Sequence, residues 1–548
     1  MDSLIQELEW GLDNMEELNI YDMSIPKEDF EFAQNENITD KKFDTKPIGF
    51  LKDALIRFRK NKGSVVAFFV IMLIVLYALI VPFCVPSHKA LQPDSYYARM
   101  APRNTALKES LGIMGGFKDL DGSEQGLVFE YAKGVAAESY DGRSMALKDA
   151  YDSYYNPVFK VNYTNTVMKG KTVSTNYNFK VDTYLQVGFI YKTVTLEEYN
   201  ALEAWEAETG LHVLYPLIDK YTADGRDGKY SLDIKNANYW YKMKTTGSEK
   251  GVPISTTIKP GKVTTLQFSD DLVLEDNYYR VGGEIQKKIM NGSAEHQSYE
   301  VRLLYYNYYR YLRGAEPNYF FGTDTLGLDF AYRLGQGLRL SLIFAVVISV
   351  INFILGALYG AVEGYYGGAT DMILERVSDI LSGIPFIIVA TLFQMHLAKK
   401  AGPIPSLIFA YVLTGWIGTA SRVRTQFYRF KNEEYVMAAR TLGASDRRLI
   451  WKHIFPNTLG TIITSIALVI PGVIFSESSL SFLGIVNLGT TTSTSLGTLL
   501  SESSTIWTSA PHLMLFPSIF ISLLMICFNL FGNGLRDAFN PSLRGVEE

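Results

Sequence analysis

The sequence predicts a mainly α-helical membrane protein with six transmembrane helices and an α+β domain inserted between the first and second of them. The first observation is a set of six apolar stretches, each close to the roughly 20 residues that an α-helix needs to cross a bilayer core. The second is composition: 47% of the 548 residues are hydrophobic, yet the mean hydropathy is only +0.05, which fits a hybrid of membrane and soluble parts. The third is a polar, Tyr-rich segment, residues 87–319, that is long enough for a separate domain.

The N-terminal segment, residues 1–62, is expected to be an acidic cytoplasmic tail followed by an amphipathic helix. Acidic residues outnumber basic ones roughly three to one up to residue 46, which is typical of a solvated tail. Apolar residues then recur at helical spacing, namely Phe50, Leu51, Ala54, Leu55 and Phe58. This stripe predicts a helix that either lies on the membrane surface or simply extends the first span.

The six predicted spans are residues 64–83, 340–362, 372–397, 404–427, 459–483 and 513–531. The first is not a cleaved signal peptide, because its apolar run is too long and no small-residue cleavage site follows it. The expected organisation is therefore the segment 1–62, a first transmembrane helix 63–86, an insert 87–319, and a core 320–548. This core holds the other five helices and a cytoplasmic loop, 428–457.

Lys and Arg predict the orientation of the spans, because they collect on the cytoplasmic side of membrane proteins. Clusters precede the first span, follow the fourth and follow the sixth: Arg57, Arg59, Lys60 and Lys62; Arg422, Arg424, Arg429 and Lys431; Arg536 and Arg544. Six crossings put all three clusters on one side, with Lys399 and Lys400 as exceptions. We expect a multi-pass membrane protein with both termini cytoplasmic and the insert outside. The net charge of -5 argues against nucleic acid as a partner.

The insert reads as an α+β globule. Residues 178–187 and 256–268 are strand-like, and residues 195–208 are helix-like. Near its end stand five closely spaced tyrosines, Tyr305, Tyr306, Tyr308, Tyr309 and Tyr311. They predict either an aromatic peptide-binding surface or, as the favoured interpretation, packing onto the lipid headgroup layer.

The loop between the fourth and fifth spans predicts a helix-turn-helix over residues 434–457. Apolar and small residues recur at helical spacing up to Leu442, and Gly443 follows where a left-handed cap is needed. Ser445 is expected to cap a second helix that Pro456 stops. A basic helical hairpin between two spans is typical of a docking surface for a cytoplasmic partner, although a plain solvated loop is the simpler alternative.

The order of residues in this loop resembles the EAA coupling loop of ABC-importer permeases, closest to the C-type subunit of the dipeptide and oligopeptide branch. Met437 stands in place of the Glu that names the motif. Four further motifs match in register: Phe321, Gly322, Thr323, Asp324, Gly327 and Asp329; Tyr365, Gly367, Gly368 and Asp371; Glu477, Ser478, Leu480, Ser481, Phe482, Leu483 and Gly484; Asn529, Leu530, Gly532, Leu535, Arg536, Asp537 and Pro541. The resemblance covers residues 320–543 closely and 26–85 loosely, and it does not cover the insert.

The resemblance implies the type I ABC-importer permease fold and a role as the permease subunit of an ATP-driven importer of di- or oligopeptides in a bacterial plasma (inner) membrane. It implies no catalytic residue and no cofactor in this chain, since separate ATPases use ATP and Mg. The implied partners are a second homologous permease subunit, two cytoplasmic ABC ATPase subunits, an extracytoplasmic solute-binding lipoprotein, the peptide and the lipid bilayer. The implied ATPase-coupling residues are Glu434, Ala438, Ala439, Gly443, Ala444, Ile454 and Pro456. Import of nickel, haem or another small solute is the alternative within the family, and a membrane-anchored sensor or adhesion protein is a remote one.

Ionisable residues inside the spans are further candidates, because burying charge in hydrocarbon is costly. Glu375, Arg376 and Asp379 lie early in the third span, and Arg376 can pair with Asp379 at i,i+3. Glu477 lies late in the fifth. These residues either clasp helices together, which is favoured, or line the translocation path. No Cys and His cluster has zinc spacing. Acidic clusters at residues 119–124 and 224–227 could hold calcium, but such clusters more often form simple turns, so we expect no metal site. Thr323 or Asp324 is expected to cap a short helix at the outer interface.

Overall fold

The computed structural model describes residues 50–122, 124–139, 144–146, 154–168, 171–217, 236–238, 263–265, 278–281, 284–291, 298–489 and 493–539. The chain divides into two compact units, Met1–Asp53 and Ala54–Glu548. Of the first unit, only the start of helix α2 (Phe50–Lys60) is described. The acidic tail predicted up to residue 46 lies outside the described residues.

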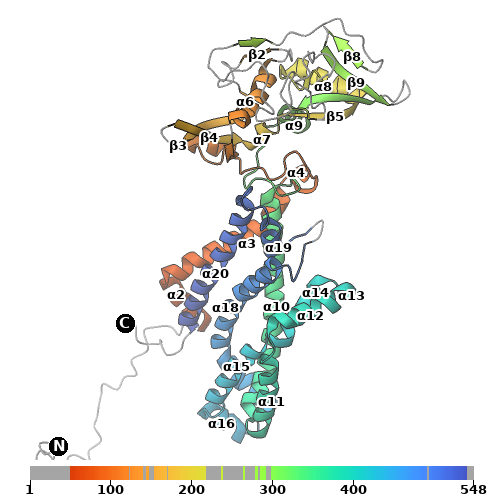
Figure 1. Cartoon of the computed structure of the whole chain (residues 1–548). Coiled ribbons are helices and arrows are strands. Elements are labelled where there is room, and N and C mark those ends of the chain that lie inside the picture. The colour runs from red at the N-terminus through yellow and green to blue at the C-terminus, as the bar shows by residue number, and fades with distance from the viewer. Residues whose placement is uncertain are drawn as a thin grey trace, which may run out of the picture. The chain divides into compact units, whose positions relative to one another are not determined.

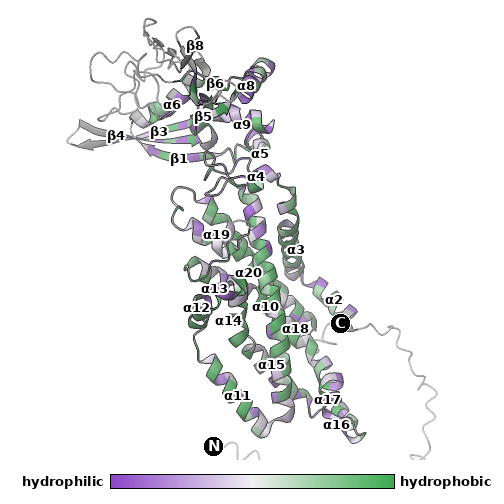
Figure 2. Cartoon of the chain, turned by 90° about the vertical axis from the view of Figure 1, so that its right-hand side faces the viewer, coloured by the Kyte–Doolittle hydropathy of each residue, from purple (hydrophilic) through white to green (hydrophobic). Residues whose placement is uncertain are grey.

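Five described helical stretches are long and apolar enough to cross a membrane. They are α3 (Lys62–Cys84), α10 (Phe330–Tyr366), α14 (Pro403–Thr414) running on into α15 (Ile417–Phe430), the part of α18 (Phe455–Phe482) from Ile462, and α20 (His512–Phe539). Figure 1 labels these helices, and Figure 2 shows hydrophobic residues along them. The prediction of a mainly helical membrane protein is confirmed.

The third predicted span is a broken helix pair. α11 (Gly368–Ser382) and α12 (Phe386–His396) meet at an angle of 73°. The span predicted over residues 372–397 is therefore not one continuous helix, because Pro385 disfavours the helical conformation of Ile384 and cannot donate a backbone hydrogen bond. The described part of the chain reaches six crossings only if this pair counts as one.

Helix α2 is separate from α3. Asn61 leaves the helical conformation, and its side-chain Oδ1 accepts a hydrogen bond from the Ser64 N–H at 3.1 Å. This N-cap excludes the alternative that the helix with the apolar stripe is a plain extension of the first span. Two shorter helices complete this part of the chain, α13 (Ala398–Ala401) and α19 (Leu496–Ser503).

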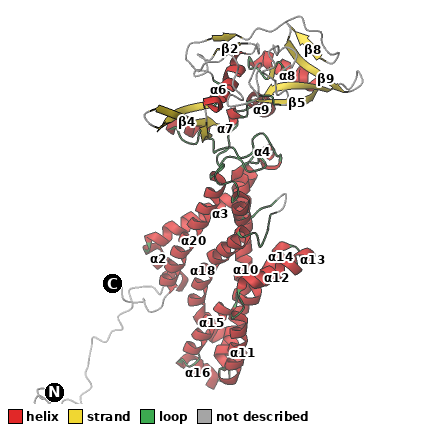
Figure 3. Cartoon of the chain, viewed as in Figure 1, coloured by secondary structure: helices red, strands yellow, loops and turns green. Residues whose placement is uncertain are grey.

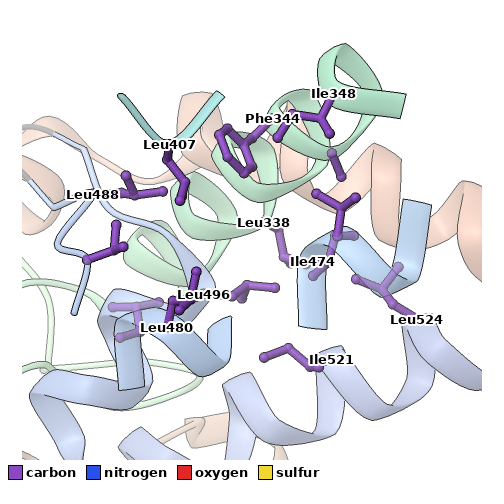
Figure 4. Close-up of a cluster of buried hydrophobic side chains, with 14 of the residues drawn as sticks. Leu338, Phe344, Ile348, Leu407, Ile474, Leu480, Leu488, Leu496, Ile521 and Leu524 are labelled. Carbon is purple, nitrogen blue, oxygen red and sulfur yellow. The ribbon is translucent and has the colours of Figure 1, made fainter. Parts of the chain in front are cut away.

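Buried apolar side chains from α3, α10, α12, α14, α18, α19 and α20 form one core cluster. Figure 4 shows ten labelled members of this cluster converging from several helices: Leu338, Phe344, Ile348, Leu407, Ile474, Leu480, Leu488, Leu496, Ile521 and Leu524. The apolar run of residues 340–362 thus has one face in this core, while exposed residues such as Ile343 and Ile354 form its other face.

Helices α10 and α15 approach each other at backbone distance. Gly356, Gly360 and Gly364 are four residues apart on α10, so they share one face of the helix. A Cβ at Gly360 would lie 2.2 Å from the backbone oxygen of Ala420, and one at Gly364 would lie 2.6 Å from Phe427 Cβ. Glycine is therefore required at this contact, as it often is where membrane helices pack closely.

All the described strands lie between α3 and α10, where they occur together with helices (Figure 3). One antiparallel sheet has the order β1 (Phe117–Gly122), β4 (Lys171–Asp182), β3 (Val158–Met168). A second has the order β5 (Phe189–Thr195), β10 (Ser298–Leu304), β9 (Glu284–Asn291), β8 (Tyr278–Val281), with β6 (Leu214–Tyr215) also pairing with β10. β2 (Ser144–Ala146) pairs with β7 (Val263–Thr265).

Six helices accompany these strands: α4 (Ser87–Leu91), α5 (Thr105–Leu111), α6 (Glu124–Ser139), α7 (Thr183–Gln186), α8 (Leu196–Thr209) and α9 (Tyr305–Arg313). The helix predicted over residues 195–208 is α8, which begins where the Thr195 hydroxyl accepts from the Glu198 N–H at 3.1 Å. Of the strand expected over residues 256–268, only β7 belongs to the described residues.

The tyrosines of α9 lie in the core of the insert. Tyr305, Tyr306, Tyr308 and Tyr309 are at most 6% exposed and pack with buried residues of β5, β10 and α8. The favoured prediction of packing onto lipid headgroups is wrong. The spacing of the tyrosines marks a buried helix face, because aromatic rings supply large packing area wherever their hydroxyls find partners.

The chain enters and leaves the insert through two segments that are hydrogen-bonded to each other. Arg103 pairs with Tyr319 in an antiparallel bridge, the Asp94 N–H donates to the Leu326 carbonyl at 2.9 Å, and the Met100 N–H donates to Thr323 Oγ1 at 2.8 Å. These contacts hold the start and end of the insert together.

No helix follows Thr323 and Asp324, so the predicted interfacial helix is wrong. Asp324 Oδ1 instead accepts from the N–H groups of Leu326 (2.8 Å) and Leu328 (2.9 Å), which fixes a turn. Asp329 is the residue that caps a helix, because its Oδ1 accepts from Ala331 N–H at 2.8 Å at the start of α10.

Candidate functional site

The segment from Glu434 to Pro456, which we call the knuckle, begins with the short helix α16 (Glu434–Thr441). The helix ends in a Schellman motif: the Gly443 N–H donates to the Arg440 carbonyl at 3.0 Å, and the Ala444 N–H donates to the Ala439 carbonyl at 3.1 Å. Gly443 has φ +80°, so the prediction of a left-handed glycine is confirmed. A Cβ there would meet no described atom within 4 Å.

The second half of the knuckle continues into the membrane helix. α17 (Asp446–Arg448) starts after Ser445, passes into a π-helical turn η5 (Leu449–Ile454) and then into α18. The prediction that Pro456 stops this helix is wrong, since Pro456 lies in the first turn of α18. The wide π turn directly before it accommodates a residue that lacks an N–H. Ser445 is the N-cap residue, but its side chain makes no capping hydrogen bond.

One side of the knuckle is buried against the long helices. Val436, Leu449 and Ile454 are each 0% exposed and pack with residues of α10 and α15, including Tyr365 and Phe427. In addition, the Tyr365 hydroxyl donates to Asp446 Oδ1 at 2.6 Å. The knuckle is thus attached to α10 and α15 by packing and to α18 by a continuous helix.

The other side of the knuckle is exposed and carries apolar and small residues. Leu442 is 88% exposed, Met437 is 48% exposed, and Ala438 and Gly443 are also exposed. Beside them, Ser445, Arg447, Arg448 and Trp451 line an open hollow of about 580 Å³. A surface that combines exposed Leu and Met side chains with arginines is typical of a contact with another protein.

The predicted coupling residues divide between the two sides. Glu434, Ala438, Gly443 and Pro456 are exposed, Ala439 and Ala444 are partly buried, and Ile454 is fully buried. Ile454 therefore contributes to the attachment of the knuckle within the chain. Leu442 and Trp451 also belong to the exposed side. Neither was predicted as a coupling residue, because apolar residues at helical spacing usually indicate a core.

Arg424 joins α15 to α11 through two carboxylates. Its Nε and Nη2 donate to the two oxygens of Asp371 at 2.6 and 2.7 Å, and its Nη1 and Nη2 donate to Glu375 at 2.8 and 3.1 Å. The Tyr428 hydroxyl also donates to Asp371, at 2.7 Å. We call these four residues the arginine clasp. Bidentate guanidinium–carboxylate pairs are both strong and directional.

The clasp contains one predicted site residue and omits two others. Glu375 belongs to it, whereas Arg376 pairs with Asp379 at 3.2 Å on an exposed face, as expected from their i,i+3 spacing. Arg424 was missed as the partner of Glu375 because its positive charge was assigned only to the cytoplasmic cation cluster. The two residues are 49 positions apart, and sequence spacing does not show such a contact.

Glu477 lies at the centre of a buried network of hydroxyl groups. Ser495 Oγ donates to its Oε1 at 2.7 Å, Ser481 Oγ donates to Oε1 at 3.1 Å, and Ser341 Oγ donates to Oε2 at 3.1 Å. Glu477 is 0% exposed. The network links α10, α18 and the start of α19 around one carboxyl group, which is the geometry of a clasp between helices.

A further ion-pair cluster lies at the start of α10. Arg333 Nε is 3.2 Å from Asp324 Oδ2, and its Nη2 is 3.0 Å from Glu502 Oε2, between α10 and α19. Burial raises the pKa of the Asp324 carboxyl, and the Arg333 charge opposes that rise. Asp324 was predicted as a motif residue and a helix cap, and its pairing with Arg333 was not predicted.

Comparison with known proteins adds an independent line of evidence. Residues 352–545 match the model of the family "binding-protein-dependent transport system inner membrane component". Residues 49–102 match that of the N-terminal TM domain of oligopeptide transport permease C. Together the two matches cover nearly all residues from 49 to the C-terminal end except residues 103–351.

Individual relatives agree with the family models. The chain is 41% identical over 233 residues to the dipeptide transport system permease protein DppC of Bacillus subtilis, an alignment that covers 41% of this chain and 70% of the relative. It is 40% identical over 228 residues to the oligopeptide transport system permease protein OppC of the same organism, covering 41% and 73%. The corresponding OppC of Escherichia coli is 36% identical over 231 residues, covering 42% and 74%.

A solved structure, described as inward-facing conformations of the MetNI methionine ABC transporter, is 15% identical to this chain. The alignment covers 38% of this chain and 98% of that one, with a TM-score of 0.31.

Proposed function

Because this chain belongs to the family of binding-protein-dependent transport system inner membrane components, as a permease of the oligopeptide and dipeptide C type, we propose that it moves di- or oligopeptides across a bacterial plasma membrane. The permease is the translocation component of an ABC transporter, and ATP hydrolysis belongs to a separate subunit in this family. The relatives named for dipeptide and oligopeptide transport support the choice of solute.

The proposed complex contains a second homologous permease, two cytoplasmic ABC ATPase subunits that use ATP and Mg, and an extracytoplasmic solute-binding lipoprotein. The exposed side of the knuckle carries this proposal. Ala438, Gly443 and Leu442 offer a small-residue and apolar surface that no described residue of this chain covers. An ATPase subunit is the occupant we assign to this surface.

The knuckle is built to transmit a push from such a partner to several helices. It packs on α10 and α15, and it continues into α18 without a break. The arginine clasp then connects α15 to α11. Nucleotide-driven closure of the ATPases would therefore move α10, α11, α15 and α18 together, which is rigid-body motion of the kind that alternating access requires.

We further propose that both termini and the knuckle are cytoplasmic and that the insert is extracytoplasmic. The concentration of Arg and Lys around α2 and the knuckle supports this orientation under the positive-inside rule. On this basis Glu375 and Glu477 act as clasps between helices, in agreement with their bonds to Arg424 and to the serine hydroxyls.

Reconstitution tests the proposed function directly. The chain would be co-expressed with a companion permease, ATPases and a binding protein of the same transporter family, and the purified complex would be placed in liposomes. We expect di- or oligopeptides to stimulate ATP hydrolysis and labelled peptide to accumulate inside. Stimulation by nickel or haem but not by peptides would contradict the peptide assignment, and failure to co-purify with ATPases would contradict the docking role of the knuckle.

A further inference from the structure

A cavity of about 390 Å³ lies in the insert where the segment after α4 meets β5 and α9. Its size is within the range of small-molecule binding sites. The cavity is remote in sequence from the knuckle, from the arginine clasp and from Glu477. Of its lining, only the segment from His88 to Tyr96 lies within residues that match a family model.

Tyrosine rings form much of the cavity wall. The Tyr96 and Tyr305 ring centroids are 4.8 Å apart, and those of Tyr305 and Tyr308 are 6.3 Å apart. Tyr96 is 44% exposed and Leu312 is 46% exposed, whereas Tyr305 and Tyr308 are buried. The wall thus runs from buried rings to half-exposed apolar side chains, which suits an aromatic or aliphatic group entering from outside.

Two charged residues at the cavity already have partners within the insert. Asp94 Oδ2 accepts from the Tyr305 hydroxyl at 2.6 Å, and its Oδ1 accepts from the backbone N–H groups of Tyr96 and Tyr97. Lys192 Nζ lies 3.0 Å from Glu198 Oε1 and also donates to the Tyr308 hydroxyl. Neither charge is free to dominate recognition of a ligand.

Arg313 and His88 are different, because they carry sheltered nitrogen atoms without a partner among the described residues. Arg313 Nη2 donates to Gln92 Oε1 at 3.1 Å, but Arg313 Nε is buried and bonded to no described acceptor. The same holds for His88 Nε2. Burial lowers the pKa of His88, and the positive charges of Arg313 and Lys89 lower it further. The cavity wall therefore includes a guanidinium whose Nε–H has no acceptor among the described residues.

An unpaired buried donor is costly unless a ligand or water satisfies it, and a guanidinium bonds best to a carboxylate. We propose that the cavity binds a carboxylate group carried by an aromatic or aliphatic residue, the chemistry found at the C-terminal end of a peptide. Arg313 holds the carboxylate, His88 lies beside it, and the rings of Tyr96, Tyr305 and Tyr308 contact the side chain of that residue.

Binding at this cavity does not depend on which solute the pore transports, since it involves the insert alone. If the solute is a peptide, the insert would hold peptide at the outer face before or after delivery. If the solute is another molecule, the insert would still be a sensor of carboxylate-terminated ligands. Direct binding to the purified full-length chain, without ATPases, separates the two proposals.

The test uses calorimetric titration of the detergent-purified chain with the tripeptide Ala-Ala-Tyr, its C-terminal amide, and N-acetyl-tyrosine. We expect the free acid to bind, and the amide to bind at least about tenfold more weakly because it lacks the charged partner of Arg313. Binding of N-acetyl-tyrosine as well would identify one residue and its carboxylate as sufficient, whereas binding of the tripeptide alone would identify peptides as the source. Both results support a carboxylate-binding site in this cavity.

Variants then locate the site. Arg313→Gln should weaken binding of the free acid at least about tenfold. Arg313→Lys should bind the free acid with an affinity between those of the unaltered chain and Arg313→Gln, because lysine keeps the charge but lacks the planar guanidinium. Arg310→Gln is the matched control on the same helix, since Arg310 lies 3.8 Å from Glu316 and does not line the cavity. The proposal is overturned if acid and amide bind equally, if neither binds, or if Arg313→Gln binds as the unaltered chain does. Should Arg313→Gln fail to fold, as judged from its thermal unfolding midpoint, the comparison of acid and amide on the unaltered chain decides.

Discussion

At the scale of single residues, Gly443 and Arg424 have different roles. Gly443 sets the direction in which the chain leaves α16, and its φ of +80° is a conformation that side chains with a Cβ rarely adopt. Arg424 satisfies two carboxylates that would otherwise be partly buried without a cation. The first residue faces the exposed side of the knuckle, and the second acts inside the chain.

We predict that Gly443→Val lowers transport-coupled ATP hydrolysis more than it lowers the amount of protein in the membrane. A left-handed β-branched residue costs on the order of 1–2 kcal/mol. Within this chain the added Cβ meets no described atom within 4 Å, so we expect the main steric conflict to arise with the partner. The measurements are membrane abundance, ATPase co-purification and peptide-stimulated hydrolysis.

Gly210→Val is the matched control for that experiment. Gly210 follows α8 in the insert with φ +68° and also has no described atom near its Cβ position. It reports the backbone strain alone. If Gly443→Val and Gly210→Val affect stimulated hydrolysis equally, the exposed side of the knuckle has no special role in docking.

Replacing Arg424 with Gln should reduce the stability of the chain by about 2 kcal/mol, because four charge-assisted hydrogen bonds are lost and Asp371 keeps only Tyr428 as a partner. The thermal unfolding midpoint in detergent measures this change. Arg376→Gln is the control, since the Arg376–Asp379 pair is exposed and such pairs contribute less than about 1 kcal/mol. Equal losses in the two variants would show that the clasp is not a stabilising contact.

At the scale of elements, the sequence predicted most helices and failed where two local rules competed. The apolar run 372–397 has the length of one span, but Pro385 divides it into α11 and α12. Pro456 showed the opposite error, because a π turn before it lets the helix continue. Gly443 was predicted correctly, since Schellman geometry is a purely local property. The pairing of Arg424 with Glu375 was not predicted, because it depends on tertiary structure: α11 and α15 both pack on α10.

The glycine contact between α10 and α15 offers an element-scale prediction. Gly360→Ala should weaken the packing of these helices, because its Cβ would approach the Ala420 backbone oxygen to 2.2 Å and backbone cannot move aside as a side chain can. We expect a lower unfolding midpoint and reduced membrane abundance. Gly418→Ala, on α15 with no described atom near its Cβ position, should leave both unchanged; an unaffected Gly360→Ala would mean that the helices can separate without cost.

At the scale of the whole molecule, the orientation of the chain in the membrane depends on its charge distribution and on the number of crossings. The cation distribution predicts that the knuckle and the insert lie on opposite sides of the membrane. The helix count alone gives five crossings or six, depending on whether α11 and α12 count as one. An odd number of crossings would separate the termini, so the topology needs a direct test.

Labelling of single cysteines in intact cells provides it. In a background of Cys84→Ser and Cys527→Ser, we expect Glu208→Cys at the exposed end of α8 to react with an impermeant maleimide. Ser445→Cys in the knuckle should react only after the cells are permeabilised. Both positions are exposed in the structure, so accessibility within the chain does not explain a difference. Reaction of both positions in intact cells, or the reverse pattern, contradicts the proposed orientation.

The bridge between Arg103 and Tyr319 has a consequence for how such a chain can change over evolution. Because the two ends of the insert are neighbours, the membrane helices on either side meet the same pair of anchor points whatever lies between them. The entropy of closing a loop grows only slowly with its length, so a compact module can be exchanged for a short turn with little effect on the span pair that it interrupts. The surface of the insert can therefore diversify while the membrane helices stay unchanged. For the same reason, the insert could be transferred to a related permease at the same two positions.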